Sequence, residues 1–328
     1  MVKNPKIFRV FAWIILVQVC AVSLFFLFDG PDYFKANSFT PTEEVSSLMD
    51  KLELTDTGTR ILKASAPKLE DNEEFNSHCT ASDASAYVLG CYEPRSGSIH
   101  LYNITTTDLP GIVESTTAHE LLHAIWTHLK FWEKNSITTE LAEFYNKLPE
   151  DAQLRETMEL YGSDEFYDEL HSRLGTEIKD LPENLENHYA KYFKNQDHIV
   201  DLFNSYSDKY RGIEKRLKKL EEEINAKSEE VESETTFYHN WGEELNNKII
   251  EFNTSVEEID MATYIAKRNE LQTEIDKFNE YYKNLSAKID ELNELINEYN
   301  EYAVKQKEIS DHIDSTAVPE ATNLKKGN

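Results

Sequence analysis

The first hydrophobic feature of the chain is an uncharged run at residues 10–28, which follows three basic residues in segment 1–9. As a helix these nineteen residues would extend roughly 28 Å, close to the ~30 Å hydrocarbon core of a bilayer. The preceding positive charge predicts a cytoplasmic N-terminus, with the rest of the chain outside a cell membrane. A cleaved signal peptide is the alternative, although its apolar part is usually shorter. We therefore expect a single-pass transmembrane signal anchor.

A polar segment with a glycine and a proline, residues 29–39, predicts a linker after this run. Residues 40–54 then show the apolar spacing of an amphipathic helix, with a capping box that begins at Thr40. The linker is thus expected to end where a folded domain starts.

Strand signals follow over a short part of the chain, at residues 84–92 and 98–104. A turn sequence lies between them, so they predict a β-hairpin within a small sheet. After residue 112 the hydrophobic spacing predicts helices, at residues 112–129, 139–148, 151–161, 164–174 and 183–205. These elements define an expected domain over residues 40–205.

Residues 206–313 repeat apolar side chains at alternating spacings of three and four, regularly in the second half. This spacing predicts a coiled-coil seam. In the first half Lys227, Glu234 and Lys248 take inward positions, where a parallel dimer would face each with its own copy. We expect an antiparallel helical hairpin that serves as a surface for a protein partner, with a parallel dimer as the alternative. The sequence predicts a disordered tail at residues 314–328.

Composition supports a mainly α fold with some β structure, an α+β class, because the 328 residues include only 10 Gly and 9 Pro. With 34 basic and 61 acidic residues, the net charge is −27. Such a charge repels phosphate backbones, which excludes nucleic-acid binding as the main activity. The charge is compatible with a protein or peptide ligand.

Three cysteines are too few for a disulfide scaffold, and their spacing fits neither a zinc ribbon nor a thioredoxin-like pair. Cys20 lies inside the apolar run. Cys79 and Cys91 are candidates for one disulfide in an oxidising compartment, which would stabilise the fold by roughly 3 kcal/mol. Two free buried thiols are the alternative.

The candidate chemistry lies in the predicted helix at residues 112–129, which contains an HExxH sequence. His119 and His123 are four residues apart, so both imidazoles leave one face of the helix and can bind one metal ion. Glu120 lies at the edge of that face, where it can accept a proton from water beside the metal. The same helix with two core histidines and a capping acid is the structural alternative.

This motif resembles that of the zincin metallopeptidases, and the resemblance covers residues 40–205. It implies a zinc ion (Zn2+) held by His119 and His123, Glu120 as the catalytic base, and a strand before the helix that pairs with substrate. The metzincin branch requires a further glycine and histidine, but this chain has Trp126 and Leu129 there, and His128 one position too early. That branch is therefore disfavoured.

The gluzincin branch takes its third zinc ligand from a glutamate on a later helix, and the chain offers Glu169 for that role. Glu177 and Asp168 are the other candidates in the same segment. The segment departs from the NExxSD form of thermolysin-like enzymes, which leaves the substrate class open. We predict a His119, His123 and Glu169 ligand set.

Related enzymes often stabilise the oxyanion of the reaction with a tyrosine or histidine, and His171, His188 and Tyr189 are candidates here. Each is equally explained as a core residue of an amphipathic helix. Together the patterns predict a membrane-anchored, extracytoplasmic zinc peptidase. The alternative is an envelope structural or adhesive protein in which the coiled coil is the functional part and the zincin-like domain is inactive.

Overall fold

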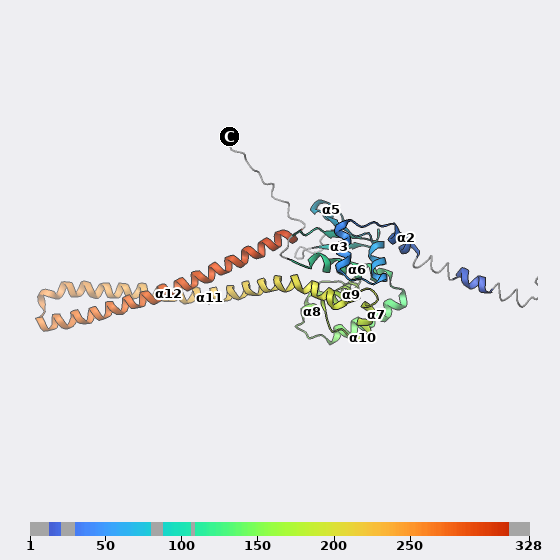
Figure 1. Ribbon diagram of the computed structural model, residues 1–328. Coiled ribbons are helices and arrows are strands. Elements are labelled where there is room, and N and C mark those ends of the chain that lie inside the picture. The colour runs from blue at the N-terminus through green and yellow to red at the C-terminus, as the bar shows by residue number, and fades with distance from the viewer. Residues whose placement is uncertain (1–12, 21–29, 80–87, 106–108, 315–328) are drawn as a thin grey trace, which may run out of the picture. The chain divides into compact units, whose positions relative to one another are not determined.

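The computed structural model describes residues 13–20, 30–79, 88–105 and 109–314 (Figure 1). The chain divides into two compact units, the first made of Met1–Lys209 and Ile309–Asn328, the second of Tyr210–Glu308. The first unit contains a three-stranded sheet and several helices. The second consists almost entirely of helix over its described residues.

The described elements follow one another in a fixed order along the chain. In the first unit they are α2 (Gly30–Ser38), α3 (Glu43–Lys51), α4 (Asp56–Ala64), β1 (Lys68–Glu70), α5 (Asn72–His78), β2 (Gly90–Glu93), β3 (Ser98–Tyr102), α6 (Ile112–His128), α7 (Phe131–Lys147), α8 (Gln153–Met158), α9 (Phe166–Glu177) and α10 (Glu183–Tyr189). The long helices α11 (Gln196–Ser255) and α12 (Met261–Ile313) follow, with the short 3-10 helix η1 (Val256–Glu258) between them.

The prediction of a transmembrane helix at residues 10–28 is wrong for the part of the chain that the structure describes. There, no helix has both the length and the apolar character needed to cross a membrane. Residues 13–20 are helical, but eight residues rise only about 12 Å against a hydrocarbon core of ~30 Å. Residues 10–12 and 21–28 of the predicted span lie outside the described residues.

The linker predicted at residues 29–39 is instead largely helix α2, which contacts α4. The glycine and proline that suggest a linker occupy its first turn, where a proline is compatible with a helix. The next helix, α3, begins later than the pattern indicates, because Thr42 rather than Thr40 is its N-cap. The Thr42 hydroxyl accepts a hydrogen bond from the Val45 amide at 3.3 Å.

The sheet has the strand order β1-β3-β2, with β3 in the centre. Strands β2 and β3 form an antiparallel pair, and β1, which the sequence pattern does not indicate, pairs with β3 in parallel. Three residues are too few to show an alternation of apolar and polar positions. The predicted strand residues 84–87 lie outside the described chain.

The two faces of the sheet contact different helices. Leu101 of β3 is opposite Gly90 of β2, and a Cβ atom on Gly90 would lie 2.7 Å from the Thr116 side chain of α6. This face therefore packs on α6. On the other face Phe75 of α5 packs against Tyr102 of β3, with ring centroids 5.6 Å apart.

Helix α9 packs closely against α6 because Gly175 has no side chain. A Cβ atom there would lie 2.5 Å from Leu122 Cδ1 of α6 and 2.6 Å from Tyr189 Cε1 of α10. Leu122 and Tyr189 are fully buried in the hydrophobic core. The close approach sets the distance between the helix that carries the HExxH sequence and the helix that carries Glu169.

Cys79, just after α5, forms a disulfide with Cys91 of β2, and their Cα atoms are 5.9 Å apart. The bond links the end of α5 to the edge strand β2. Cys20 is free and exposed. The alternative of two free thiols at positions 79 and 91 does not hold.

In the second unit α11 and α12 lie side by side and antiparallel (Figure 1). Their seam contains stacked aromatic rings, such as Tyr238 and Phe278 with centroids 4.4 Å apart. The three charged residues that interrupt the seam on α11 each pair with an opposite charge on α12. These pairs are Lys227 with Glu291 at 2.8 Å, Lys248 with Glu274 at 2.6 Å, and Glu234 with Lys288. The predicted tail, except Asp314, lies outside the described residues.

Candidate metal centre

Helix α6 places His119 and His123 on one face, one helical turn apart. Their Nε2 atoms are 3.1 Å apart, and both side chains are about one-fifth exposed, at 20% and 19%. The neighbouring residues Leu121, Leu122 and Ile125 are buried in the core. The helix is thus anchored by its apolar side while both imidazoles remain accessible.

Glu169 of α9 extends its carboxylate to the same point. Its Oε2 atom lies 3.7 Å from His119 Nε2 and 3.5 Å from His123 Nε2. A tetrahedral zinc ion with bonds of about 2.0–2.1 Å separates its ligand atoms by roughly 3.3 Å. The spacing of the two nitrogens and the oxygen therefore fits a zinc ion, and His2Glu is a donor set that zinc accepts in catalytic sites.

Asp168, one of the alternative third ligands, contacts the far side of the His123 ring. Its Oδ1 atom accepts a hydrogen bond from His123 Nδ1 at 2.7 Å. This bond fixes the tautomer in which the His123 Nε2 lone pair is free to bind a metal. With a metal bound, Asp168 would therefore orient a ligand, whereas Glu169 would supply one.

Glu177, the other alternative, is bound by an arginine of the same helix. Arg173 lies 2.6 Å from Glu169 Oε1 through its Nε atom and 2.7 Å from Glu177 Oε1 through its Nη1 atom. Its guanidinium holds the Glu169 carboxylate with the other oxygen, Oε2, directed at the histidines. Glu177 thus supports Arg173 and is separate from the ligand set.

The charges of these groups are strongly coupled. Burial raises the pKa of the Glu169 carboxyl, but His119, His123 and Arg173 outweigh it and hold that pKa well below its usual range. Burial lowers the pKa of His123, yet hydrogen bonds to Asp168 and Glu169 raise it to about 10. Imidazole must be neutral to coordinate a metal, so a bound cation would replace the proton on His123.

Glu120 lies beside the ligand set without belonging to it. Its side chain is 6% exposed, and burial raises the pKa of its carboxyl despite the two nearby histidines. Strand β2 lies directly against it, since a Cβ atom on Gly90 would be 3.0 Å from Glu120 Cγ. The glycine gives the strand room to pass close to the carboxylate.

All these groups line one cleft of about 600 Å³. Its walls include residues 88–92, around the outer strand β2, and Tyr161, Arg173 and Thr176 on the side of α9. The volume is within the range of small-ligand and substrate sites. The arrangement suits the activation of water beside an extended substrate.

The three residues predicted for the oxyanion lie elsewhere. His171 is fully buried, shares a 2.8 Å hydrogen bond with His188, and accepts at its carbonyl from the Tyr189 hydroxyl at 2.8 Å. None of the three is among the described residues that line the cleft. His171 is two residues from Glu169, a turn of about 200°, which directs it into the core.

Burial sets the charge of this internal pair. It lowers the pKa of His171 well below its usual range and that of His188 to about 4. Both rings are therefore neutral near pH 7 and share one hydrogen bond as donor and acceptor. His128, considered in the sequence for the metzincin ligand, instead pairs with Asp32 of α2 at 3.0 Å.

The sequence reasoning missed Tyr161 and Arg173. The Tyr161 hydroxyl accepts a hydrogen bond from Arg173 Nη2 at 3.3 Å, and burial raises the pKa of the phenol. Arg173 is four residues from both Glu169 and Glu177, and this spacing of opposite charges along a helix is visible in the sequence. The sequence analysis places Tyr161 at the end of a predicted helix, residues 151–161, whereas α8 ends at Met158 and Tyr161 lies between α8 and α9.

The chain matches no known family model, no curated protein and no solved structure. The resemblance to zincins therefore depends on the site itself, on the HExxH helix and on Glu169 of a later helix. What the site can do follows from its donor atoms, its spacing and its cleft.

Proposed function

We propose that this protein is a zinc-dependent peptidase in which Glu120 acts as general base. The observation that carries the proposal is the convergence of His119, His123 and Glu169, whose ligand atoms lie within 4.8 Å of one another. They meet in a cleft that also contains Glu120. Core histidines with a chance acid nearby would have no need of an accessible cleft.

Zinc, when bound, would polarise the scissile carbonyl and lower the pKa of water at the site towards about 7. The chain supplies the proton transfers. Glu120 takes a proton from the attacking water, and the raised pKa of its buried carboxyl makes it a stronger base than an exposed glutamate. The water oxygen bonds to the carbonyl carbon, and Glu120 delivers the proton to the amide nitrogen as the C–N bond breaks.

Strand β2 is the proposed guide for the substrate. It pairs with β3 on one side, is one of the two edge strands of the sheet, and lines the cleft. An extended peptide can add to such an edge through main-chain hydrogen bonds. Its scissile bond would then lie close to Glu120, against which Gly90 of the strand packs.

Tyr161 is the proposed donor to the oxyanion in place of His171, His188 and Tyr189. Its hydroxyl interacts with both Arg173 and Glu169, next to the ligand set. The raised pKa keeps the phenol protonated at neutral pH, so that it can donate a hydrogen bond. Arg173 fixes both the phenol and the third ligand.

A structural or adhesive protein is the second candidate function, and the long α11–α12 hairpin favours it. Phe237 and Tyr282 of this hairpin are 53% and 55% exposed and belong to aromatic contacts across the two helices, where contiguous exposed apolar side chains would mark a binding surface. Such a protein has no need to bind zinc or to hydrolyse peptides. Zinc bound specifically by His119, His123 and Glu169 therefore separates the two functions.

The test compares the full chain with its Glu120→Gln variant. We expect the wild type to retain zinc at the His119, His123 and Glu169 site and to cleave some members of a library of quenched fluorescent peptides. Glu120→Gln keeps the shape but removes the base, so zinc should remain while hydrolysis falls by about 10²–10⁴-fold.

Glu114→Gln is the matched control, because Glu114 lies on the same helix, pairs with Lys51 at 2.6 Å and is away from the cleft lining. Its activity should equal that of the wild type. Full activity of Glu120→Gln would contradict the mechanism. If all zinc could be removed without a change in peptide hydrolysis, the proposed function would be contradicted.

A further inference from the structure

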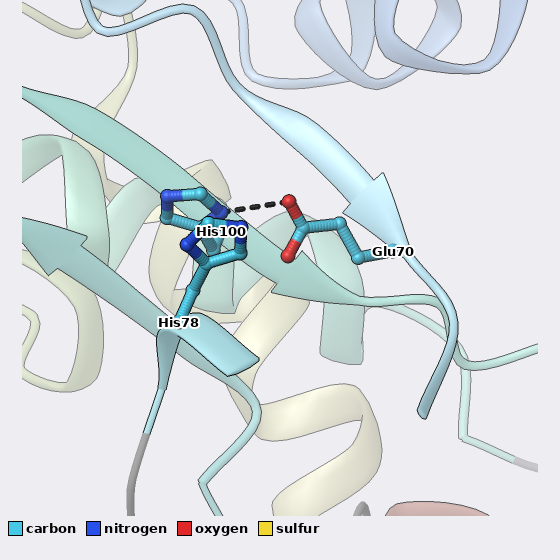
Figure 2. Close-up of side chains that lie close together, drawn as sticks. All are labelled: Glu70, His78 and His100. Carbon is cyan, nitrogen blue, oxygen red and sulfur yellow. Dashed lines mark hydrogen bonds and ion pairs between the residues drawn. The ribbon is translucent and has the colours of Figure 1, made fainter. Parts of the chain in front are cut away.

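A second group of metal-ligating side chains lies on the face of the sheet opposite α6. Glu70 comes from β1, His100 from β3 and His78 from the end of α5, as Figure 2 shows. Side chains alternate along a strand, so His100 faces away from its neighbours Ile99 and Leu101, which are buried on the α6 side. The group is therefore separate from the cleft.

Glu70 and His100 are buried polar residues with incomplete hydrogen bonding. They are 1% and 3% exposed, and His100 Nδ1 lies 2.7 Å from Glu70 Oε1 (Figure 2). The remaining atoms, Glu70 Oε2 and His100 Nε2, are buried without a hydrogen-bond partner among the described residues. Leaving such atoms unpaired costs free energy, and a buried carboxylate is especially costly.

His78 completes the group from the solvent side. Its ring stacks on that of His100 with centroids 4.0 Å apart and an interplanar angle of 17°. One ligand atom from each of His78, His100 and Glu70 lies within 4.8 Å of the other two. Three side chains of the types that bind zinc thus meet where two buried atoms, Glu70 Oε2 and His100 Nε2, have no hydrogen-bond partner among the described residues.

We propose that Glu70, His78 and His100 bind a second metal ion, a divalent transition metal of the zinc type. Two imidazole nitrogens and one carboxylate oxygen suit Zn2+ better than Ca2+ or Mg2+, which prefer oxygen ligands alone. The lone pairs of two stacked rings lie in two nearly parallel planes, and one ion cannot lie in both, so one ring must turn for both to bind. His78 is the ring that turns, because it is exposed.

The position of this site indicates a structural role. Its proposed ligands join three elements of the chain, β1, β3 and α5. Cys91 lies directly opposite His100 across the β2–β3 pair and is bonded to Cys79, the residue after His78. The ion and the disulfide would together attach α5 to the strand that borders the cleft.

Zinc stoichiometry in the full, disulfide-bonded chain tests the proposal. The probe is zinc alone, at a free concentration held by nitrilotriacetate, with bound metal measured by elemental mass spectrometry. We expect two equivalents in the wild type, one in His78→Ala, and one in the double variant His119→Ala/His123→Ala. His239→Ala, which removes an exposed histidine of α11, is the matched control and should keep two.

Affinity and protection give independent readouts. His78→Ala should weaken the second equivalent by at least about 100-fold, more than the loss of a partner outside the ligand set typically costs. In the wild type, zinc should protect His78 from diethyl pyrocarbonate, as measured on the peptide that contains it. This second measurement requires no substitution, so it stands if a variant fails to fold.

The outcomes separate this proposal from the proposed function. One equivalent that His78→Ala retains and the double variant loses would overturn the second site and leave the peptidase intact. One equivalent with the reverse pattern would support the second site and contradict the peptidase. A second equivalent that persists in both variants, or an unprotected His78, would mark adventitious binding and overturn the proposal.

Discussion

At the scale of single residues, α9 shows how three acids within ten positions take different roles. Asp168 and Glu169 are neighbours, about 100° apart on the helix, and so reach different atoms of the same imidazole. Glu177 is two turns further and reaches Arg173. The angular position of each acid, more than its acidity, determines its contact with the site.

This division predicts the order of three substitutions. Glu169→Ala removes a direct ligand and should lower zinc affinity by more than about 100-fold, whereas Asp168→Asn, which loses an orienting bond, should cost about 10–100-fold. Glu177→Gln should have the smallest effect. Competition with a chromophoric chelator gives the three affinities, and a largest loss at Asp168 or Glu177 would move the third ligand to that residue.

At the scale of elements, the close contact of α6 and α9 is what brings the ligands together. The ligands come from two helices, so their spacing depends on the distance between those helices. Gly175 sets that distance through its contact with Leu122 and Tyr189. A change in helix packing should therefore affect metal binding as well as stability.

Gly175→Ala should destabilise the fold by about 1–3 kcal/mol, because the added methyl group meets two fully buried side chains. It should also lower zinc affinity. Gly212→Ala is the control, since a Cβ atom at that exposed position of α11 would meet nothing within 4 Å. That change should be neutral or stabilise by up to about 1 kcal/mol. Urea denaturation measures both, and equal effects would contradict the packing argument.

The parts of the site that depend on local geometry could be predicted from the sequence. The placing of His119 and His123 on one face follows from the helical period alone. The sequence favours Glu169 over Asp168 and Glu177 as third ligand, but the contacts of the other two could not be predicted, because they depend on how helices pack. The same holds for His171, whose burial is decided by contacts with Trp126 and His188.

Elements were missed where the local signal was short or ambiguous. Strand β1 has three residues and pairs with a strand about thirty positions away, at Lys68 with His100. Helix α2 begins with residues typical of turns. The apolar run at residues 10–28 gave a strong hydropathy signal, yet the described chain contains no helix that could cross a membrane.

At the scale of the whole molecule, the chemistry and the long hairpin belong to different units. The ligands and Glu120 lie within Met1–Lys209, and the hairpin is formed by Tyr210–Glu308. The charges that interrupt its seam are paired across the two helices, such as Lys248 with Glu274. This pairing satisfies within one chain the residues that would repel in a parallel dimer.

Replacement of Tyr210–Glu308 by a short flexible linker should leave zinc content and the hydrolysis of short peptides unchanged. If the hairpin binds protein substrates through its exposed aromatic residues, cleavage of folded proteins should fall by roughly tenfold or more, because a second contact raises the effective concentration. Parallel assays on a short peptide and a folded protein measure the two rates. If the replacement changed both rates by the same factor, the hairpin would be a passive spacer.

The two faces of the central strand β3 border the two proposed sites, so both sites depend on the number of residues in this strand. Leu101 faces α6 and His100 faces α5, one residue apart. Insertion or deletion of one residue here would reverse every side chain on the strand, since the period is two. A substitution in β3 can impair one face alone. A single codon gained or lost would place an imidazole in the core beneath the HExxH helix and a leucine among the ligands of the other site, and so would disable both at once.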